Sequence, residues 1–285
     1  MLASILREAA GSVDAVLATI GNLNNDIGMP LTLLKLRANH RYAVIAMGMN
    51  HSGEIDYLTR LARPDVAVIN NAGSAHLAGL GSVEAVARAK GEILAGLPES
   101  GIAVINADDM YAPLWRELAG KRAVIEFGLE RNVAVHAQWR VQNHGAHIEV
   151  STSQGGFSAN LQVPGVHNVR NALAATAAAL ALHVALPVIA AGLEKFCGVA
   201  GRLQRKVAMH GAVLIDDSYN ANPASLHAAL RVLAQADGKK ILVLGDMGEL
   251  GADAAHLHSE IGAEARRLGI NELLALGKLT AHTVQ

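Results

Sequence analysis

Residues 102–106 read IAVIN, and nearly the same five letters, VAVIN, stand at residues 66–70. Two more short apolar runs flank this pair, YAVIAM at 42–47 and RAVIEF at 122–127. Between the runs lie helical patterns, at 54–62, 82–97 and 110–118. Short apolar runs that alternate with helices are typical of βαβ units with a buried parallel sheet. This stretch therefore predicts an α/β fold with a mostly parallel sheet flanked by helices.

The rest of the chain predicts further elements around this core. Helices are expected at 1–10 and 253–268, and two packed Ala-rich helices within 172–193 that meet near His183–Pro187. A small antiparallel section is expected after residue 132, with strands at 133–139, 146–152 and 156–163 and turns at 143–145 and 154–156. Buried strands should follow at 212–216, 239–245 and 272–277. We expect one α/β domain over residues 1–206 and part of a second over 207–285.

Composition excludes several classes of protein. The chain has 24 Lys and Arg against 25 Asp and Glu, a net charge of −1, without the basic excess of a nucleic-acid binder. Its single cysteine, Cys197, excludes an internal disulfide and a cysteine-built zinc site and fits a reducing, cytoplasmic compartment. Arg7 and Glu8 argue against a signal peptide. Residues 172–193 lack charges, but alanine is only marginally apolar and His183 and Pro187 interrupt them, so we expect no membrane insertion.

Polar segments follow several of the expected strands, where ligands of open α/β sheets gather. The segments are GMNHSGEI at 48–55, NNAGSAHL at 70–77 and DDSYNANP at 216–223. The plainer interpretation of the first makes it a loop in which Ser52 caps the next helix. In the third, Asp216 and Asp217 repel each other unless a cation or hydrogen-bond donors are near. We consider this third segment the least suited to a mere connection.

Other polar positions leave two interpretations open. The loop GNLNNDIGMP at 21–30 is either a surface turn or a ligand loop. Asn168 and Asn171 lie one helical turn apart, so their amides could read the edge of a base or could cap the helix. From spacing alone, Lys90 is better explained as a solvated lysine.

Taken together, these segments resemble the Mur ligases, ATP-dependent enzymes that form amide bonds in peptidoglycan precursors. The matching stretches occur in family order and cover nearly the whole chain: 22–34, 48–55, 70–82, 89–93, 165–175, 201–204, 216–226 and 245–251. DDSYNANP and GDMGELG indicate the branch that joins D-alanyl-D-alanine to UDP-N-acetylmuramoyl-tripeptide. The resemblance implies that residues 1–206 form the central, ATP-binding domain and that 207–285 form part of a Rossmann-like C-terminal domain. We expect no counterpart of the family's UDP-sugar-binding first domain within these 285 residues.

The resemblance also implies ATP and Mg²⁺ as cofactors and an acyl phosphate as the intermediate that the incoming amine attacks. Metal ions and positive side chains would relieve the charge on the transferred phosphoryl group. The implied catalytic residues are Lys90, as a carbamate that anchors metal, His76, as a metal ligand, and Arg202, as a phosphate contact. Asn168, Asn171 and Asp217 would bind the nucleotide with Arg202. The implied substrate-binding residues are Asn22, Asn24, Asn25, Asp26, Asn220 and Asn222. Such a protein is expected to be a monomer with small-molecule partners, without nucleic-acid or membrane partners.

Two departures from the family pattern stand out. The sequence contains no G-x-x-x-x-G-K-[ST] phosphate loop, which in the family directly precedes the helix that matches Met1–Ala10. Ala46 stands where the family has a metal-binding glutamate, and alanine cannot coordinate a cation. We therefore expect this chain to be a fragment that cannot form the acyl phosphate.

Three other functions are alternatives to this one. A sister amide ligase, such as another muramyl-peptide ligase or a folylpolyglutamate synthetase, is disfavoured by DDSYNANP. A non-catalytic homologue that acts as a binding protein is favoured by Ala46 and by the missing phosphate loop. A nicotinamide dehydrogenase is the weakest, because no G-x-G-x-x-G follows a strand.

Overall fold

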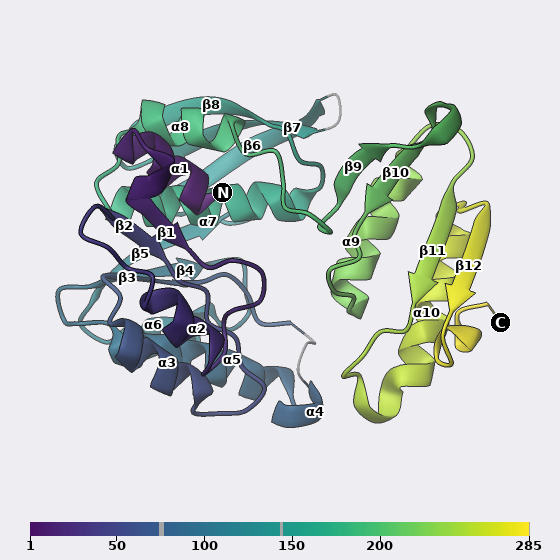
Figure 1. Ribbon diagram of the computed structural model, residues 1–285, viewed down its shortest axis with the longest axis horizontal. Coiled ribbons are helices and arrows are strands. Elements are labelled where there is room, and N and C mark those ends of the chain that lie inside the picture. Colours follow the sequence, from purple (N-terminus) through teal and green to yellow (C-terminus); the bar gives the residue numbers. More distant parts are fainter. Residues whose placement is uncertain (74–76, 143–144, 285) are drawn as a thin grey trace.

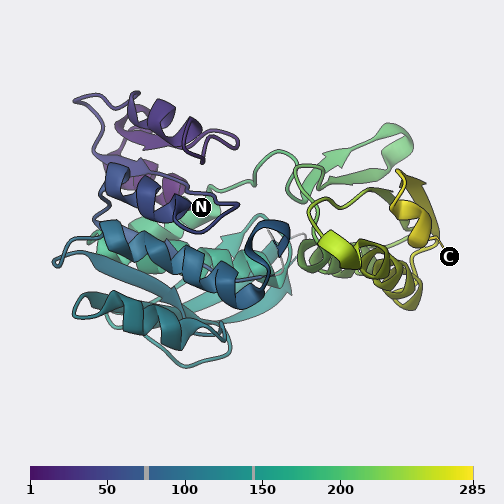
Figure 2. The same cartoon turned by 90° about the horizontal axis from the view of Figure 1, so that it is seen from below.

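A computed structural model of the chain describes residues 1–73, 77–142 and 145–284. The described residues form a large lobe, residues 1–194, and a smaller C-terminal lobe, residues 201–284 (Figure 1). The segment between them runs across the gap that separates the two lobes in Figure 2. None of the helices in the described parts is both long and apolar enough to cross a lipid bilayer.

A six-stranded sheet forms the centre of the large lobe. Its strands are β3 (Val66–Ile69), β4 (Ile102–Asn106), β5 (Ala123–Gly128), β6 (Val135–Gln142), β7 (Gly145–Thr152) and β8 (Gly155–Leu161), and they lie in that order. The pairs from β3 to β6 are parallel, and β6, β7 and β8 pair antiparallel. The structure thus confirms a mostly parallel α/β sheet with a small antiparallel section. The expected turn at 143–145 lies largely outside the described residues.

Helices cover both faces of the sheet because its strands are apolar on both sides. Val104 on β4 faces one core cluster, with the Ala-rich helix α7 (Val166–Ala181), and its neighbours Ala103 and Ile105 face the other, with Trp115. Helices α1 (Leu2–Ala10) and α8 (Leu186–Glu194) join the α7 side. The opposite side carries α3 (Glu54–Ala62), α5 (Val83–Gly91) and α6 (Ala112–Ala119) (Figure 1). Two helices meeting near His183–Pro187 are confirmed.

A separate two-stranded parallel sheet lies beside the main one. It pairs β1 (Val16–Ala18) with β2 (Tyr42–Val44). β1 was not predicted, and the strand predicted over 42–47 is only half as long. The reason is that β1 ends at Ala18, so the chain beyond Val44 has no strand partner, and the N–H of Ala46 donates instead to the Thr19 hydroxyl at 2.9 Å. The short helix α2 (Gly28–Leu33) follows β1, and α4 (Leu77–Leu80) follows β3.

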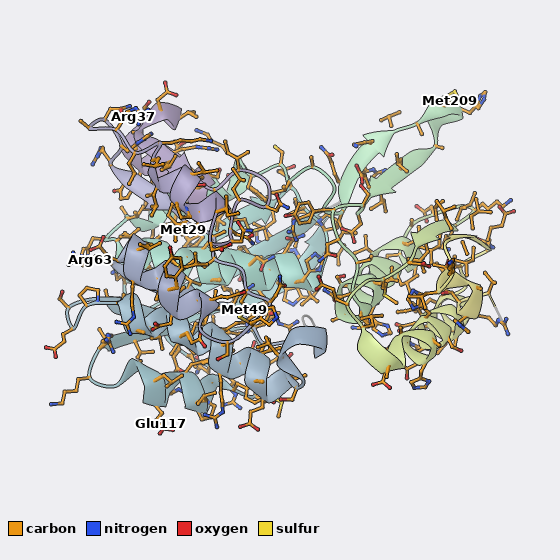
Figure 3. The ribbon with its side chains drawn as sticks, turned by 60° about the horizontal axis from the view of Figure 1, so that its bottom comes forward. Met29, Arg37, Met49, Arg63, Glu117 and Met209 are labelled. Atoms are coloured by element: carbon orange, nitrogen blue, oxygen red, sulfur yellow. The ribbon has the colours of Figure 1, made fainter. Side chains whose placement is uncertain are left out.

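The helix predicted over 82–97 also differs. It consists of α5 and a tighter 3₁₀ segment, η2 (Glu92–Gly96). The change follows from tertiary contacts, because the Thr59 hydroxyl donates to the Ile93 carbonyl at 2.7 Å and the Glu92 side chain turns toward α3. Met29 and Met49 lie in the buried cluster under these helices (Figure 3).

The C-terminal lobe contains two short sheets and two helices. An antiparallel pair, β9 (Gln204–Val207) and β10 (Val213–Asp216), carries Met209 at its outer end (Figure 3). A parallel pair, β11 (Ile241–Gly245) and β12 (Glu272–Leu276), packs on α9 (Pro223–Ala234) and α10 (Ala254–Arg267). β9, which was not predicted, crosses the boundary expected between residues 206 and 207. One-turn 3₁₀ segments complete the described chain, η1 (Val13–Ala15), η3 (Met209–Gly211), η4 (Gly251–Asp253) and η5 (Thr280–His282).

Candidate nucleotide site

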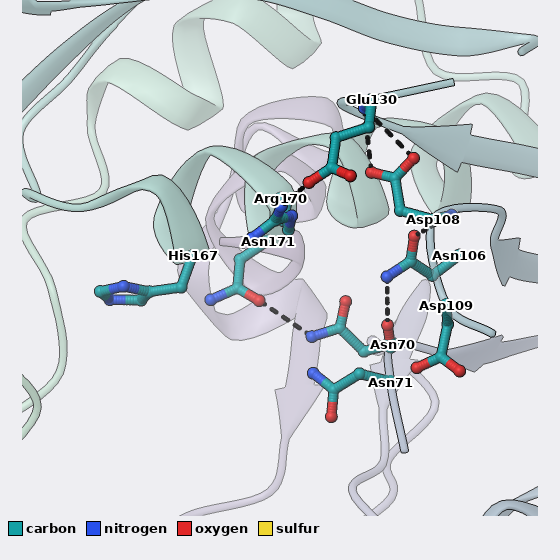
Figure 4. Close-up of a pocket in the computed structure, with 9 residues that line it drawn as sticks. All are labelled: Asn70, Asn71, Asn106, Asp108, Asp109, Glu130, His167, Arg170 and Asn171. Carbon is teal, nitrogen blue, oxygen red and sulfur yellow. Dashed lines mark hydrogen bonds and ion pairs between the residues drawn. The ribbon is translucent and has the colours of Figure 1, made fainter. Parts of the chain in front are cut away.

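A pocket of about 260 Å³ opens where the carboxyl ends of β3, β4 and β5 face the start of α7 (Figure 4). The residues that line it are Asn70, Asn71, Asn106, Asp108, Asp109, Glu130, His167, Arg170 and Asn171. The polar ends of parallel strands and the first turns of a helix therefore meet here, as in other open α/β sheets that bind ligands.

Amide side chains form a continuous chain across this pocket. Asn70 donates through Nδ2 to Oδ1 of Asn171 at 2.9 Å, and Nδ2 of Asn106 donates to the Asn70 carbonyl at 2.9 Å. Asn168 and Asn171 share one face of α7, since Nδ2 of Asn171 lies 3.5 Å from Oδ1 of Asn168. Asn168 also donates to the Pro164 carbonyl at 2.7 Å, which fixes the start of the helix. Asn171 therefore lines the pocket, and Asn168 braces the turn that presents it.

The two aspartates of the pocket are occupied by backbone groups. Asp108 accepts N–H groups from Leu129 at 2.6 Å and from Glu130 and Arg131. Asp109 accepts the N–H of Ala72 at 2.8 Å, so it holds the loop after β3 against the loop after β4. These carboxylates shape the loops, because their lone pairs already have donors.

An ion pair and a histidine close the far side of the pocket. Arg170 contacts Glu130 at 2.6 Å and links α7 to the loop after β5. Burial lowers the pKa of His167, and the nearby Arg170 lowers it further. The ring is therefore neutral at pH 7 and carries one donor and one acceptor nitrogen. The neutral imidazole and the asparagine amides of the lining suit a ligand with several hydrogen-bonding edges.

Lys90 lies next to this lining, on the last turn of α5. Its ammonium donates to the Asn71 carbonyl at 2.8 Å. Burial lowers its pKa, and the charge of Asp109 partly offsets that effect. The solvated lysine that spacing alone suggested is wrong, since the side chain turns inward and is desolvated. His76, the other predicted metal ligand on this side, lies outside the described residues.

The GMNHSGEI loop is held by two glutamates. Gly53, at φ +88°, is the first residue before α3, and Ser52 does not cap the helix as the plain interpretation required. Instead Ser52 donates to Glu92, which also accepts the N–H groups of Gly53 at 2.8 Å and Asp56 at 3.2 Å. Glu54 accepts the Asn50 N–H at 2.6 Å. Glu54 is therefore engaged within its own loop.

The loop of predicted substrate residues packs on the chain just beyond β2. The Asn24 carbonyl accepts the Gly48 N–H at 2.8 Å, and a Cβ at Gly48 would lie 2.6 Å from Nδ2 of Asn24. Asn25 accepts the Gly28 N–H at 2.8 Å and so supports the start of α2. Asn22 and Asp26 are exposed. This loop is therefore held against the chain beyond β2 by these hydrogen bonds, at the end of the β1–β2 sheet.

Arg202 and Asp217 lie in the C-terminal lobe. The Arg202 guanidinium lies over the Tyr219 ring, 4.2 Å from its centroid, and Asp217 accepts the Leu203 N–H at 3.0 Å. Burial raises the pKa of Asp217, whereas hydrogen bonds from Lys206 and Ser218 lower the pKa of Asp216 to about 2. Protein donors thus relieve the repulsion between the paired aspartates.

The two predicted substrate asparagines of this lobe behave differently. Asn222 caps α9, since its side chain accepts the Ser225 N–H at 2.9 Å and the Ser225 hydroxyl accepts the Asn222 N–H at 3.1 Å. Asn220 is exposed. Asn222 therefore has a local structural role, and Asn220 faces solvent.

Sequence reasoning missed several residues of the pocket. Asn106, Asp108 and Asp109 belong to the run NADD at 106–109, which begins at the last residue of IAVIN as NNAG begins at the last residue of VAVIN. That parallel was a usable signal. His167 and Arg170 lie in the stretch 165–175 that carried the family resemblance, although neither was singled out, and Glu130 lies in none of the matching stretches. Across the described ranges, no group of three or more His, Cys, Asp or Glu side chains is placed to hold a metal ion.

Comparison with known proteins agrees with this geometry. The Mur ligase middle domain matches residues 1–179, and the Mur ligase, glutamate ligase domain matches residues 201–284. UDP-N-acetylmuramoyl-tripeptide--D-alanyl-D-alanine ligase from Escherichia coli (strain K12) is 43% identical over 280 residues, which are 98% of this chain and 61% of that protein. The chain thus spans about three fifths of the length of the curated relatives it matches.

Solved structures give the same picture. A crystal structure of MurF from Acinetobacter baumannii matches with a TM-score of 0.93 and 38% identity, over 99% of this chain and 62% of that one. MurF ligase from Thermotoga maritima in complex with ADP matches with a TM-score of 0.82 and 26% identity, over 97% of this chain and 67% of that one.

Proposed function

The chain belongs to the Mur ligase family, and from this premise we propose that it is the nucleotide-binding portion of a ligase that uses ATP to join D-alanyl-D-alanine to UDP-N-acetylmuramoyl-tripeptide. The observation that carries the proposal is the amide-lined pocket between the strand ends and α7. Relatives that bear the name of this activity match almost the whole chain. We place the central domain at residues 1–206 and the partial C-terminal domain at 207–285, in a cytoplasmic monomer with small-molecule partners.

In this proposal the adenine end of the nucleotide lies against the start of α7. The Asn171 amide offers a donor and an acceptor to the pocket. Asn168 holds the first turn of α7 in place through its hydrogen bond to the Pro164 carbonyl. Arg202 contacts a phosphate group and Asp217 the ribose or an adjacent part of the nucleotide. The exposed loop residues Asn22 and Asp26, together with Asn24, Asn25, Asn220 and Asn222, belong to the substrate side.

The residues fit Mg²⁺ only in part. Burial lowers the pKa of Lys90, so its amine is neutral more often than that of a solvated lysine. Only the neutral amine adds CO₂ to give a carbamate. The oxygens of a carbamate are the kind of ligand that Mg²⁺ prefers. Ala46, however, offers no ligand atom, and Glu54 is engaged with Asn50. The phosphate loop is also missing from the 285 residues. We therefore propose that this chain binds nucleotide without forming the acyl phosphate.

Phosphate release tests the catalytic half of the proposal. ATP, UDP-N-acetylmuramoyl-tripeptide and D-alanyl-D-alanine are added to the chain, and we expect no phosphate above background. Turnover at the rates usual for enzymes, about 1–1,000 s⁻¹, would show that position 46 and the phosphate loop are dispensable.

Calorimetry tests the binding half. We expect weak affinity for ADP, and an Asn171→Ala variant that loses it, because the amide that faces the pocket is removed. Arg60→Ala on the surface of α3, where Arg60 pairs with Asp56 away from the pocket lining, serves as the control. If the Asn171→Ala variant binds ADP as tightly as the parent chain, the nucleotide binds at another part of the molecule.

Ala46 also supports a second candidate, a non-catalytic homologue that keeps the fold as a binding protein. The two candidates differ in an Ala46→Glu variant of a longer form that contains the phosphate loop. Recovered ligation favours the enzyme fragment, and unchanged inactivity favours the binding protein. Ligation with a different amino acid or peptide would identify a sister amide ligase instead.

A further inference from the structure

The Tyr219 ring lies against the guanidinium of Arg202 near β9 and β10. The distance of 4.2 Å from Cζ to the ring centroid is well inside the range of about 6 Å over which an aromatic face attracts a cation. A second arginine–tyrosine pair, Arg41 over Tyr42, is looser at 5.9 Å. The Arg202–Tyr219 pair is therefore a close stack and the tighter of the two.

The backbone fixes both partners of this stack. The Tyr219 N–H donates to the Gly201 carbonyl at 3.0 Å. Gly201 has φ +71°, and a Cβ there would lie 3.2 Å from the Tyr219 nitrogen, so a side chain at 201 would be strained and would crowd the ring-bearing residue. On the other side of Arg202, Leu203 donates to Asp217 at 3.0 Å. Arg202 is thus bracketed by two hydrogen bonds to the segment 217–219.

Stacking restrains the guanidinium without occupying its hydrogen-bond donors. The five N–H groups of arginine lie in the plane of the group, whereas the ring covers one face of that plane. Because the Arg202 side chain is exposed and Tyr219 retains 43% of its exposure, an anion can reach the edge of the guanidinium. A restrained guanidinium also loses less conformational freedom when it binds.

We propose that Tyr219 is a positioning residue that presets Arg202 for a nucleotide phosphate group. This inference rests on the proposed nucleotide-binding function, and it assigns the ring to the arginine and not to the base. Two consequences follow. Removal of the ring weakens only the phosphate-dependent part of nucleotide binding, and phenylalanine replaces tyrosine because the face of the ring, not the hydroxyl, does the positioning.

The test compares ADP with adenosine by titration calorimetry on the full 285-residue chain. For Tyr219→Leu we expect ADP affinity to fall about two- to fivefold, the range that an exposed cation–π contact supplies, with adenosine affinity unchanged. Tyr219→Phe stays close to the parent chain. In an Arg202→Ala background, which itself weakens ADP, Tyr219→Leu has no further effect. Tyr57→Leu, at a tyrosine of α3 that is 52% exposed, is the matched control and changes neither ligand.

Several results would overturn the inference. Equal loss of ADP and adenosine affinity in Tyr219→Leu would mean that the ring contacts the base, and a Phe variant as weak as the Leu variant would assign the effect to the hydroxyl. If the losses of ADP affinity in Tyr219→Leu and Arg202→Ala add up in the double variant, the two residues act independently and the ring does not position the arginine. If Arg202→Ala weakens ADP but Tyr219→Leu does not, this inference alone fails. If the parent chain does not prefer ADP to adenosine, the phosphate role of Arg202 fails and the inference falls with it.

Discussion

The carboxylate of Glu92 should be one of the stronger supports of the start of α3. Glu92 lies two residues after Lys90, yet it accepts the N–H groups of Gly53 and Asp56 at the start of α3. These are the N-cap and third positions of that helix, whose own cap residue has no side chain. A carboxylate from another helix therefore does what a capping side chain does in most helices.

The expected cost of Glu92→Ala can be built from these contacts. Loss of an N-cap acceptor typically costs about 1 kcal/mol, and loss of a negative charge at a helix N-terminus about 0.3–1 kcal/mol. The Ser52 hydroxyl loses its acceptor as well, at 2.9 Å. We expect a total near 2 kcal/mol, because the glutamate is only half-buried and water replaces part of the lost bonding. Glu92→Gln keeps one acceptor oxygen and should cost about half as much.

Amide hydrogen exchange at Gly53 and Asp56 measures this effect locally, and urea unfolding measures the total. We expect faster exchange at these two amides in Glu92→Ala, and an intermediate rate in Glu92→Gln. Glu84→Ala on the neighbouring α5 is the matched control, because Glu84 makes an exposed i,i+4 pair with Arg88, which is worth about 0.3–0.5 kcal/mol. Unchanged exchange at Gly53 and Asp56 in Glu92→Ala, or an equal loss in Glu84→Ala, would refute the reasoning.

Three further predictions concern packing and pH. Gly192→Ala should destabilise the large lobe by about 1–3 kcal/mol in urea unfolding, because the new Cβ would lie 2.4 Å from the α1 backbone; an unchanged midpoint would contradict this. Trp115→Phe should cost a similar amount, because it leaves a void and removes the donor to the Ala87 carbonyl at 2.9 Å; a thermal midpoint equal to that of the parent chain would argue against it. The pKa of Asp216 is depressed from 3.8 to about 2, so its stabilising contribution is complete above pH 4 and lost as the pH falls toward 2. In Lys206→Met, the free energy of unfolding should fall less between about pH 4 and pH 2 than in the parent chain. If the two chains lose stability equally over this range, the Lys206–Asp216 pair is not the cause of the loss.

Local sequence patterns predicted most of the elements correctly. The strand at 102–106 and the helix at 54–62 have the predicted bounds. The apolar run of the strand, the apolar spacing of the helix and the turn residues next to them each lie within a few positions of the chain. The predicted bounds are wrong where contacts with residues far away in sequence determine the end of an element. β2 stops early because its partner β1 is short, and the helix after residue 82 tightens at Glu92 because Thr59 and the start of α3 compete for its groups.

The same distinction holds for the candidate site. Motif resemblance pointed to Asn168, Asn171 and Lys90 from residues close together in sequence. The pocket itself depends on contacts such as Asn70 with Asn171, 101 positions apart, and Arg170 with Glu130, 40 positions apart. No local pattern encodes those distances, so the meeting of Arg170 with Glu130 in one pocket could not be found before the strands and α7 were placed.

Apolar periodicity, the order of polar motifs and the residue at position 46 were readable in the linear chain, since each is a property of neighbouring residues. They were enough for the fold class and the family, and for the expectation that position 46 lacks a metal-binding carboxylate. What Lys90 touches, which asparagines meet and which glutamate supports α3 became known only from the folded chain. Those properties depend on burial and on hydrogen bonds between segments that only the packing of helices against the sheet brings together.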